Sequence, residues 1–468
     1  MIADLKPYPE YKDSGLPWLG RVPSHWEVRQ ARHVGRMLKG SGGSKADAVA
    51  HGVPCVRYGE LYTTHNNFIK RAKSFVTEDC ALTYTAILYG DVLFAASGEK
   101  MEEIGKSAVN LLREPAVCGG DVIILRPFDV SAAAFLGYAT DSHGLAYQKA
   151  TMGRGTTIKH VYPDELRNLT IPLPPPSEQA AIVRFLDWAN GRLERAIRAK
   201  RKVIALLHEQ KQAIIHKAVT QGLDPNVPKR DSGIPWLGEI PAHWEVRRSK
   251  YLFTESDERS EDGFEELLSV SHLTGVTPRS QKNITMFKAE SYAGHKLCKQ
   301  DDLVVNTMWA WMGALGTSKY RGIISPAYAV YRPRRKHLLV GSYIESLLRT
   351  RPYISNIICR STGLRPSRLR LYPDMFFRLP VILPPFPEQL KIMDSVEEQT
   401  RQLTDAIVRF ENEITLLREY RTRLVADVVT GKLDVREEAL LLPEEDVIQA
   451  PEDAVDEAEE PEQEEGED

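Results

Sequence analysis

The segment Asp13–Arg29 (DSGLPWLGRVPSHWEVR) returns 218 residues later as Asp231–Arg247 (DSGIPWLGEIPAHWEVR), with 13 of 17 positions identical. Solenoid repeats have periods of roughly 20–50 residues, so this spacing is too long for one. The chain therefore contains a duplicated domain, and a duplicated chain can fold with approximate two-fold symmetry. Proteins use such symmetry to address two sites on a two-fold object, above all duplex DNA.

The repeat extends beyond this opening peptide. Further matches hold an offset of 210 residues, namely Tyr162–Asp164 with Tyr372–Asp374, Leu173–Gln179 with Leu383–Gln389, and Val219–Asp224 with Val429–Asp434. Arg126-Pro127 and Arg332-Pro333 occupy roughly similar places. Each half has a shared opening, a divergent middle (about 30–170 and 248–380), a Pro-rich hinge, a long helix and a shared exit. This pattern suits a rigid frame that carries two independent reading regions.

Two long stretches predict helices, Ser177 to about Thr220 and Glu388 to about Thr430, each with Glu near its start and Gly after its end. Apolar residues recur at steps of three and four in the first, where Lys200 interrupts the stripe, and at heptad spacing in the second. The seam residues expected to pair the helices are Leu186, Leu193, Leu207, Val396, Leu403, Phe410, Leu417 and Leu424. Each helix would be about 60 Å long. Mutual antiparallel pairing is the economical way to bury both stripes; the alternative is that each helix packs on its own domain.

Both middles predict mixed structure with short strands. The strand candidates are Val53–Tyr58, Ala86–Tyr89, Asp91–Ala95, Val122–Leu125, Leu267–Val270, Asp302–Val305 and Ala327–Tyr331. Ser131–Ala150 and Leu338–Arg351 indicate helices. The expected fold class is α+β, with two similar mixed α/β domains joined by two long antiparallel coiled-coil helices in a pseudo-two-fold duplication. The expected domains are 1–172, the first spacer helix 173–224, 225–382, the second spacer helix 383–436, and an acidic tail 437–468.

Charge is distributed unevenly along the 468 residues. Residues 1–436 contain all 61 Lys and Arg but only 48 of the 64 Asp and Glu, a formal charge of +13, whereas residues 437–468 contain 16 acids. A basic body favours a polyanionic partner, although a simple solubility balance is the alternative. The tail is expected to be disordered and solvated, with competition against nucleic acid as the minor alternative.

No apolar run reaches the length of a membrane helix, and no secretory signal is evident. Five scattered cysteines without a Cys-x-x-Cys pair indicate neither a zinc site nor a disulfide framework, which fits a reducing cytoplasm.

Basic and hydroxyl residues gather in Gly- and Ser-rich loops at 40–45, 153–159 and 362–370. Such loops can bring backbone N–H, hydroxyl and guanidinium groups to phosphates, and Arg can bond a guanine edge. A solvated loop is the alternative for each one alone, but two of them precede the matched Tyr-Pro-Asp positions. The candidate DNA contacts are Lys45, Arg57, Arg154, Thr156, Thr157, Lys159, Arg279, Arg365, Ser367, Arg368 and Arg370.

Tryptophans divide between the frame and the middles. Trp18, Trp26, Trp236 and Trp244 lie in the repeated openings, where core packing is favoured over base stacking. Trp309 and Trp311 lie in the second middle, where contact with nucleic acid is the lesser alternative to core packing.

Catalytic motifs are missing from the sequence. There is no Asn-Pro-Pro-aromatic run with a cofactor glycine loop, no His-Glu-x-x-His and no Gly-x-Ser-x-Gly. Gly98–Ser107 ends in Gly-Lys-Ser, but Lys100 stands where a P-loop has its first glycine. The Pro-Asp pairs lack the further acids and lysine of a metal-dependent nuclease. We therefore expect a chain with no catalytic residue, no bound metal and no cofactor of its own.

These features together resemble the specificity subunit of type I restriction–modification systems over residues 8–435. The motifs that carry the resemblance are both openings, both Leu-Pro-Pro-x-x-Glu-Gln hinges and Leu268–Arg279 (LSVSHLTGVTPR). The resemblance implies two target-recognition domains that each read half of a split double-stranded DNA site, separated by the two helices. It also implies modification (methyltransferase) subunits, with two expected, that bind S-adenosylmethionine, and restriction subunits driven by ATP with Mg²⁺, in a bacterial or archaeal cytoplasm. The acidic tail lies outside the family pattern.

Two other hypotheses stay open on sequence alone. The chain could be a coiled-coil protein scaffold that does not bind DNA, or a stand-alone nuclease with a cryptic site, against which the missing motifs argue. If the DNA hypothesis holds, half-sites read from one face are expected about 10 bp apart, or a multiple of that.

Overall fold

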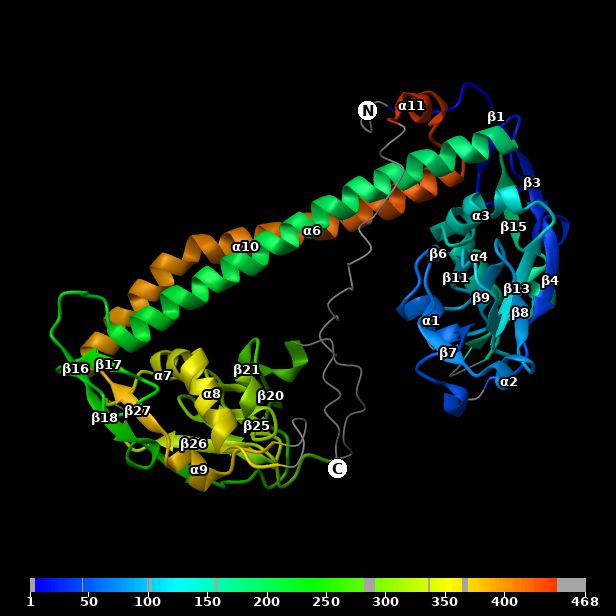
Figure 1. Ribbon diagram of the computed structural model, residues 1–468. Helices are drawn as coiled ribbons and strands as arrows, with labels where there is room; N and C mark the ends of the chain where they lie inside the picture. The colour runs from blue at the N-terminus through cyan, green and yellow to red at the C-terminus, as the bar shows by residue number, and fades with distance from the viewer. Residues whose placement is uncertain are drawn as a thin grey trace. The chain divides into compact units, whose positions relative to one another are not determined.

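The computed structural model describes residues 5–43, 45–98, 100, 103–155, 159–281, 291–335, 337–363 and 369–443 (Figure 1). The chain divides into two compact units. Unit 1 comprises residues 1–200 and 412–468, and unit 2 comprises residues 201–411. Each unit therefore contains one variable middle together with a part of each long helix.

Each unit opens with the same two antiparallel ribbons, formed by the repeated peptides. In unit 1 they are β1 (Tyr11–Asp13) with β2 (Arg21–Pro23) and β3 (Glu27–Gln30) with β15 (Thr170–Leu173). In unit 2 they are β16 (Lys229–Asp231) with β17 (Glu239–Pro241) and β18 (Glu245–Arg248) with β27 (Pro380–Leu383). The opening peptide thus pairs with the strand that precedes the Pro-rich hinge, at the other end of the middle.

The two middles share a core sheet although their sequences look unlike. In unit 1 the strand order is β4 (Gly35–Lys39), β13 (Val122–Pro127), β9 (Val92–Ala95), β11 (Ser107–Asn110) and β6 (Phe68–Ile69). In unit 2 it is β19 (Phe253–Ser256), β26 (Ala329–Pro333), β23 (Leu303–Val305) and β24 (Leu315–Thr317). The four equivalent strands follow one another in the same chain order and pair antiparallel in both units. The predicted similarity of the two mixed domains is confirmed.

The remaining strands differ between the units. Unit 1 has a second sheet of β7 (Ser74–Val76), β5 (Val53–Val56), β12 (Ala116–Cys118) and β8 (Thr85–Ile87), and a short pair of β10 (Ser97–Gly98) with β14 (Lys159–His160). Unit 2 has the pairs β20 (Leu268–Ser271) with β21 (Gly275–Pro278) and β22 (Lys296–Cys298) with β25 (Gly322–Ile324).

A buried ion pair is repeated within the shared sheet. Arg126 Nε and Nη2 donate to the two carboxylate oxygens of Asp91 at 2.9 and 2.8 Å, and Arg332 donates to Asp302 in the same way at 3.0 and 3.0 Å. Both aspartates are only 1% exposed. Bidentate pairing offsets the desolvation of these charges and fixes β13 against the turn before β9, and β26 against the turn before β23. This contact explains why the Arg-Pro pairs recur.

Shorter helices complete the two units. The α-helices are α1 (Tyr58–Thr63), α2 (Glu78–Ala81), α3 (Ala133–Thr140), α4 (His143–Met152), α5 (Pro163–Leu166), α7 (Gly341–Leu348), α8 (Arg351–Arg360), α9 (Pro373–Phe377) and α11 (Arg436–Leu441). The 3-10 helices are η2 (Ala31–His33), η3 (Lys45–Asp47), η4 (Val130–Ala132), η5 (Ser249–Tyr251), η6 (Arg279–Gln281) and η7 (Ala310–Met312).

Three expectations about these elements are wrong in detail. The strand expected to reach Tyr58 ends at Val56, because Arg57 is the extended residue that starts α1. The helix expected over Ser131–Ala150 is broken into α3 and α4, where the Ser142 hydroxyl donates to the Ala139 carbonyl at 2.7 Å and the Ser142 backbone is extended. The helix expected over Leu338–Arg351 is shorter, and α8 follows it because Thr350 is extended next to a helix with Pro in its first turn.

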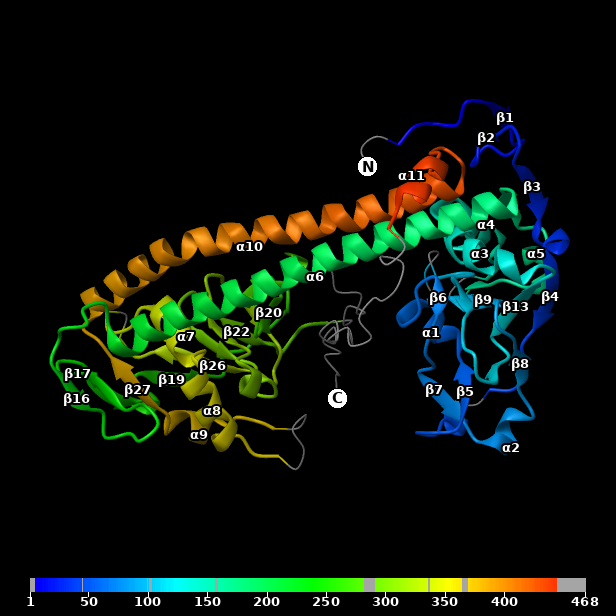
Figure 2. The same ribbon diagram turned by 45° about the horizontal axis from the view of Figure 1, so that its top comes forward.

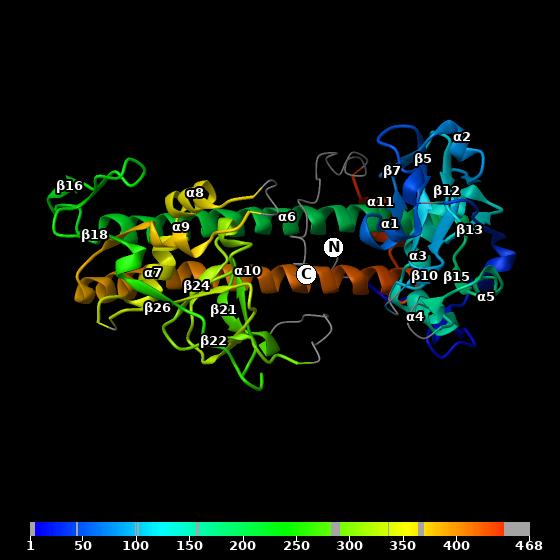
Figure 3. The same ribbon diagram turned by 90° about the horizontal axis from the view of Figure 1, so that it is seen from below.

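The long helices are α6 (Pro176–Gln221) and α10 (Phe386–Val429). They run side by side in opposite chain directions (Figure 2, Figure 3). In unit 1 Arg421 Nη1 lies 3.2 Å from Glu194 Oε2, and Lys200, which interrupts the apolar stripe, pairs with Glu413. In unit 2 Lys211 Nζ donates to Thr404 Oγ1 at 2.9 Å. The predicted antiparallel helix pair is confirmed.

The predicted seam residues are buried to different degrees. Leu186, Leu193, Val396 and Leu424 are buried, whereas Leu207, Leu403, Phe410 and Leu417 are half-buried. Leu186 and Leu424 belong to the main core of unit 1, and Val396 belongs to that of unit 2. A second row of α10 residues at heptad spacing is buried more deeply than the predicted seam, with Ile407, Ile414 and Val428 at 5%, 7% and 0% exposure. The helix ends thus join the domain cores.

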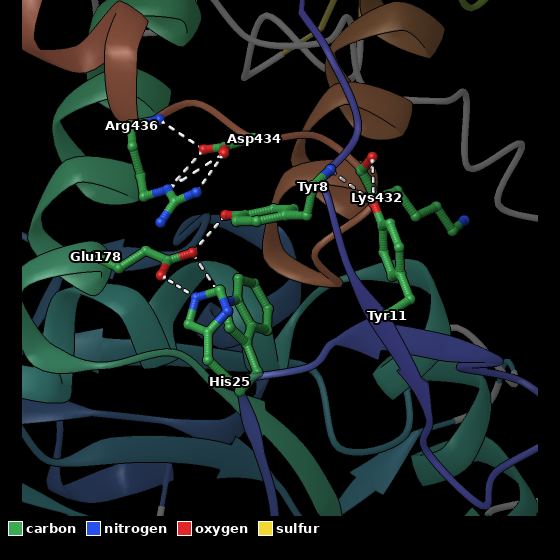
Figure 4. Close-up of polar contacts among 8 residues, drawn as sticks. Tyr8, Tyr11, His25, Glu178, Lys432, Asp434 and Arg436 are labelled. Carbon is green, nitrogen blue, oxygen red and sulfur yellow. Dashed lines mark hydrogen bonds and ion pairs between the residues drawn. The ribbon is translucent and has the colours of Figure 1, made fainter.

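A glutamate carboxylate, buried in unit 1 and half-buried in unit 2, holds the opening peptide against the start of the long helix in each unit. In unit 1 Glu178, at the start of α6, accepts hydrogen bonds from Tyr8 Oη at 2.5 Å, Trp26 Nε1 at 2.8 Å and His25 Nε2 at 2.8 Å (Figure 4). In unit 2 Glu388 accepts from Trp244 Nε1 at 3.0 Å and His243 Nε2 at 2.7 Å. Burial and the Glu178 carboxylate raise the pKa of the Tyr8 hydroxyl well above its usual range.

The tryptophans of the openings lie in the frame, as expected. Trp26 and Trp244 are 0% and 1% exposed, and Trp18 and Trp236 pack against the two main cores. Within the described part of the chain, no helix has the length and apolar character needed to cross a membrane.

Candidate nucleic-acid interface

Two loops that are distant in sequence meet in unit 1. The first, here called the strand loop, follows β9 and covers residues 96–105; the second, the Tyr-Pro loop, covers residues 153–161. Ser97–Gly98 pair with Lys159–His160, and Val161 N donates to the Ala96 carbonyl at 2.9 Å. Ser97 Oγ also lies 2.9 Å from His160 Nδ1. The Tyr-Pro loop is closed by reciprocal hydrogen bonds of 2.8 Å between Arg154 and His160.

Unit 2 repeats this junction with other residues. Its strand loop follows β23 and covers residues 306–314, and its Tyr-Pro loop covers residues 361–371. Leu371 N donates to the Thr307 carbonyl at 3.0 Å, and Thr362 and Arg370 close the loop with reciprocal hydrogen bonds of 3.0 and 2.9 Å. Arg370 Nη2 lies 3.8 Å from Met308 Sδ. Each unit therefore presents one surface made from both loops.

A cationic side chain anchors the end of each strand loop. Lys149 Nζ in α4 donates to the Gly105 carbonyl at 2.5 Å, and Arg349 Nε donates to the Gly313 carbonyl at 3.3 Å. Both glycines have positive φ, +64° and +86°, which a side chain would strain. Burial lowers the pKa of the Lys149 ammonium to about 8, and burial also lowers the pKa of Arg349. The anchors cost desolvation, and they hold the two strand loops in matching positions.

The predicted contact residues fall into three groups. Arg154, Lys159 and Arg370 lie in the Tyr-Pro loops, and Arg154 pairs with Glu165 at 2.8 Å while keeping 76% of its side chain exposed. Arg57 and Arg279 lie elsewhere, at the start of α1 and in η6. Thr156, Thr157, Arg365, Ser367 and Arg368 lie outside the described residues, as does the side chain of Lys45. Contact with DNA stays a prediction for all of them.

The sequence did not indicate that the two strand loops form part of the candidate DNA-binding surface. Their signals were present separately, in the incomplete P-loop pattern at Gly98–Ser107 and in Trp309 and Trp311. What links them is the shared sheet, since β9 and β23 deliver both loops to the Tyr-Pro loops. Across the described residues, no group of three or more His, Cys, Asp or Glu side chains is placed to hold a metal ion.

The chain is similar to known proteins. Residues 23–201 match the family model described as the type I restriction modification DNA specificity domain. The chain is 21% identical over 447 residues to the type I restriction enzyme EcoKI specificity subunit of Escherichia coli K12, covering 88% of this chain and 94% of that protein. It is 27% identical over 235 residues to a Methanocaldococcus jannaschii protein assigned as the type I restriction enzyme MjaX specificity subunit. That match covers 49% of this chain and spans about half, 52%, of the relative.

The fold has a solved counterpart. A structure from work on complex assembly and conformational transition of the type I R-M system matches 88% of this chain and 99% of its own, with a TM-score of 0.61 and 16% identity. The duplicated frame, the loop surface of each unit and the long helix pair define a protein built from two similar domains. Residues 23–201 thus match the DNA specificity domain of type I restriction–modification systems, and over 88% of its length the chain is similar to a specificity subunit of such a system.

Proposed function

We propose that unit 1 and unit 2 each read one half of a split DNA target through the surface formed by the strand loop and the Tyr-Pro loop. The observation that carries this proposal is the repetition of one loop junction, with the same anchored glycine, on two copies of the same sheet. The frame is constant while the exposed side chains differ, as independent reading of two different half-sites requires. Arginine and lysine in these loops supply phosphate and guanine contacts.

The partners are proposed from the resemblance and from the helix surface. Modification subunits would dock on the helix pair, and restriction subunits would join them. In unit 1 a groove of about 650 Å³ is lined by Leu416, Leu417 and Tyr420 among others, and Leu416 is 62% exposed. Its counterpart at the offset of 210 residues, Leu206 in unit 2, is 56% exposed. Two equivalent apolar positions fit two modification subunits. S-adenosylmethionine would bind to the modification subunits, and ATP and Mg²⁺ would bind to the restriction subunits. This chain would supply no catalytic group. The complex would act in the cytoplasm of its cell.

The direct test of this function is a methylation profile of genomic DNA from the source cell, with and without this gene. Deletion is expected to abolish methylation at one split motif. A profile with no such loss would contradict the proposal.

The protein scaffold alternative, which the exposed helix residues favour, predicts no DNA affinity at all. Titration with DNA at rising salt distinguishes this alternative from DNA recognition, because phosphate contacts make the affinity fall steeply with salt concentration.

The helix pair is proposed to set the gap between the half-sites. Inserting four residues into both α6 and α10 adds about 6 Å of helix, or roughly two base pairs, so the preferred gap is expected to change while both half-sites stay the same. A seven-residue insertion in both helices is the matched control, because it keeps the heptad seam and should shift the gap by about three base pairs. Sequencing of methylated sites gives the gap directly. An unchanged gap in both variants would show that the helices are not the spacer.

A further inference from the structure

The two strand loops occupy equivalent positions but differ in chemistry. In unit 1 the described residues of the loop are small or polar, among them Ser97, Gly98 and Lys100, apart from Ile104, which is buried in the core. In unit 2 the same position carries Met308, Trp309, Trp311 and Met312. Trp309 and Trp311 are half-buried rather than enclosed, and Met312 is 39% exposed. Among the described residues of the two strand loops, those of unit 2 therefore present an apolar surface that those of unit 1 do not.

The apolar surface of unit 2 is held in one arrangement. The two indole rings stack with centroids 5.7 Å apart and an interplanar angle of 21°. Trp311 Nε1 donates to the Met308 carbonyl at 2.9 Å, so this indole has no free donor to offer a base. Two backbone hydrogen bonds close the loop. Asn306 N donates to the Ala314 carbonyl at 2.9 Å, and Ala314 N donates to the Trp309 carbonyl at 3.2 Å. The Arg349 anchor at Gly313 fixes its far end.

The stack also lies beside the basic loop. Met308 provides both the acceptor for Trp311 and the sulfur that Arg370 approaches at 3.8 Å. Thr307, next to it, accepts the hydrogen bond from Leu371. A phosphate or guanine held by the Tyr-Pro loop of unit 2 would therefore bring the neighbouring bases over the indole pair.

We propose that the Trp309–Trp311 pair reads the C5-methyl group of a thymine in the major groove of the half-site bound by unit 2. This inference rests on the proposed function of the loop surface. Bases of a duplex are stacked on each other, so an apolar side-chain surface in the major groove can read them through the thymine methyl group, and the Trp311 Nε1 donor is already bonded to Met308. Wedging between base steps is the other apolar mode, but it is performed by single slender side chains such as Phe, Leu or Met. Two half-buried indoles whose rings stack 5.7 Å apart form a broader apolar contact than one such side chain.

The test replaces thymine with deoxyuridine, which removes only the methyl group, one position at a time in both half-sites. The full-length chain, assembled with the modification subunit of its source cell, is titrated with these duplexes. At one thymine of one half-site the substitution is expected to weaken binding roughly fivefold, the scale of one buried methyl group. In the other half-site, any effect of deoxyuridine on the affinity is expected to be the same with and without the two tryptophans.

A double-mutant cycle connects the methyl group to the tryptophans. With Trp309→Ala/Trp311→Ala, deoxyuridine at the sensitive position should cause no further loss. Phe264→Ala is the matched control, since this aromatic side chain is 89% exposed outside both loops and should leave the fivefold effect intact. Melting temperature checks the fold of each variant, and the deoxyuridine scan on the unaltered chain stands even if the double variant does not fold.

The outcomes separate this inference from the function beneath it. If no split duplex is bound, the proposed function fails. If the target is bound but deoxyuridine has no effect at any position, or the effect persists in the tryptophan variant, the methyl-reading inference is overturned while the proposed function survives. A target half-site without any T·A pair would overturn it as well. Brightening of 2-aminopurine at one base step, without a deoxyuridine effect, would identify a wedge and reject the methyl contact.

Discussion

Replacing Glu178 with alanine is expected to lower the free energy of unfolding of unit 1 by about 4 kcal/mol. The Glu178 side chain is 4% exposed and accepts hydrogen bonds from Tyr8, His25 and Trp26. Alanine would leave the Trp26 N–H and the Tyr8 hydroxyl buried without an acceptor, and it would create a cavity at the point where the opening peptide meets α6. Tyr8 also carries the Arg436 guanidinium over its ring at 5.1 Å, and Arg436 pairs with Asp434. The loss therefore extends to the exit of α10.

The same chain contains the control for this experiment. Glu388 holds the equivalent position in unit 2, but its side chain is 28% exposed and, within the described residues, accepts hydrogen bonds from His243 and Trp244 without a tyrosine. Glu388→Ala is expected to cost about 2 kcal/mol, because water can replace part of what is lost. Hydrogen exchange of the β3–β15 amides in unit 1 and the β18–β27 amides in unit 2 reports the two losses separately. An equal loss of unfolding free energy in both units would contradict the importance of burial and of the Tyr8 contact.

The frame could be predicted from sequence because its residues repeat. The openings, the hinges and the two exits are similar enough to align, and the heptads of residues 388–430 indicate a long paired helix without any further information. The observed α10 (Phe386–Val429) begins two residues before that prediction and ends one residue earlier. What repetition could not give was the role of Glu178 and Glu388, which alignment marks as constant without saying what they bind.

The shared sheet of the middles could not be predicted in the same way. Its strands are three to six residues long and largely buried on both faces, so no alternating pattern distinguishes them or sets their order. The separation between the starts of equivalent strands also varies, from 218 residues for β4 and β19 to 207 for β13 and β26, which hides the repeat from alignment. The Asp91–Arg126 and Asp302–Arg332 pairs kept a trace of it in the recurring Arg-Pro. Juxtaposition of the strand loop with the Tyr-Pro loop follows from this sheet, and so it too was out of reach.

Replacing Arg365 and Arg368 with alanine is expected to weaken binding to the full split target on the order of 100-fold, entirely through the half-site that unit 2 reads. These residues belong to the loop that Thr362 and Arg370 close. A bidentate arginine–guanine contact contributes about 1–3 kcal/mol of discrimination, and a phosphate contact adds affinity without discrimination. Affinity is measured at fixed salt for the intact target and for duplexes in which one half-site or the other is scrambled.

The crossed design decides where each unit binds. On a duplex whose unit 2 half-site is already scrambled, Arg365→Ala/Arg368→Ala should weaken binding little further. On a duplex whose unit 1 half-site is scrambled, the same variant should show its full loss of affinity. Arg154→Ala/Lys159→Ala in unit 1 should show the reverse pattern, because these residues occupy the equivalent loop. Arg401→Ala, on α10 with an exposed side chain, removes a positive charge outside both loops and should act equally on every duplex. Uniform losses from both loop variants would mean that the loops bind phosphates only, and that each half-site is read by another part of its unit.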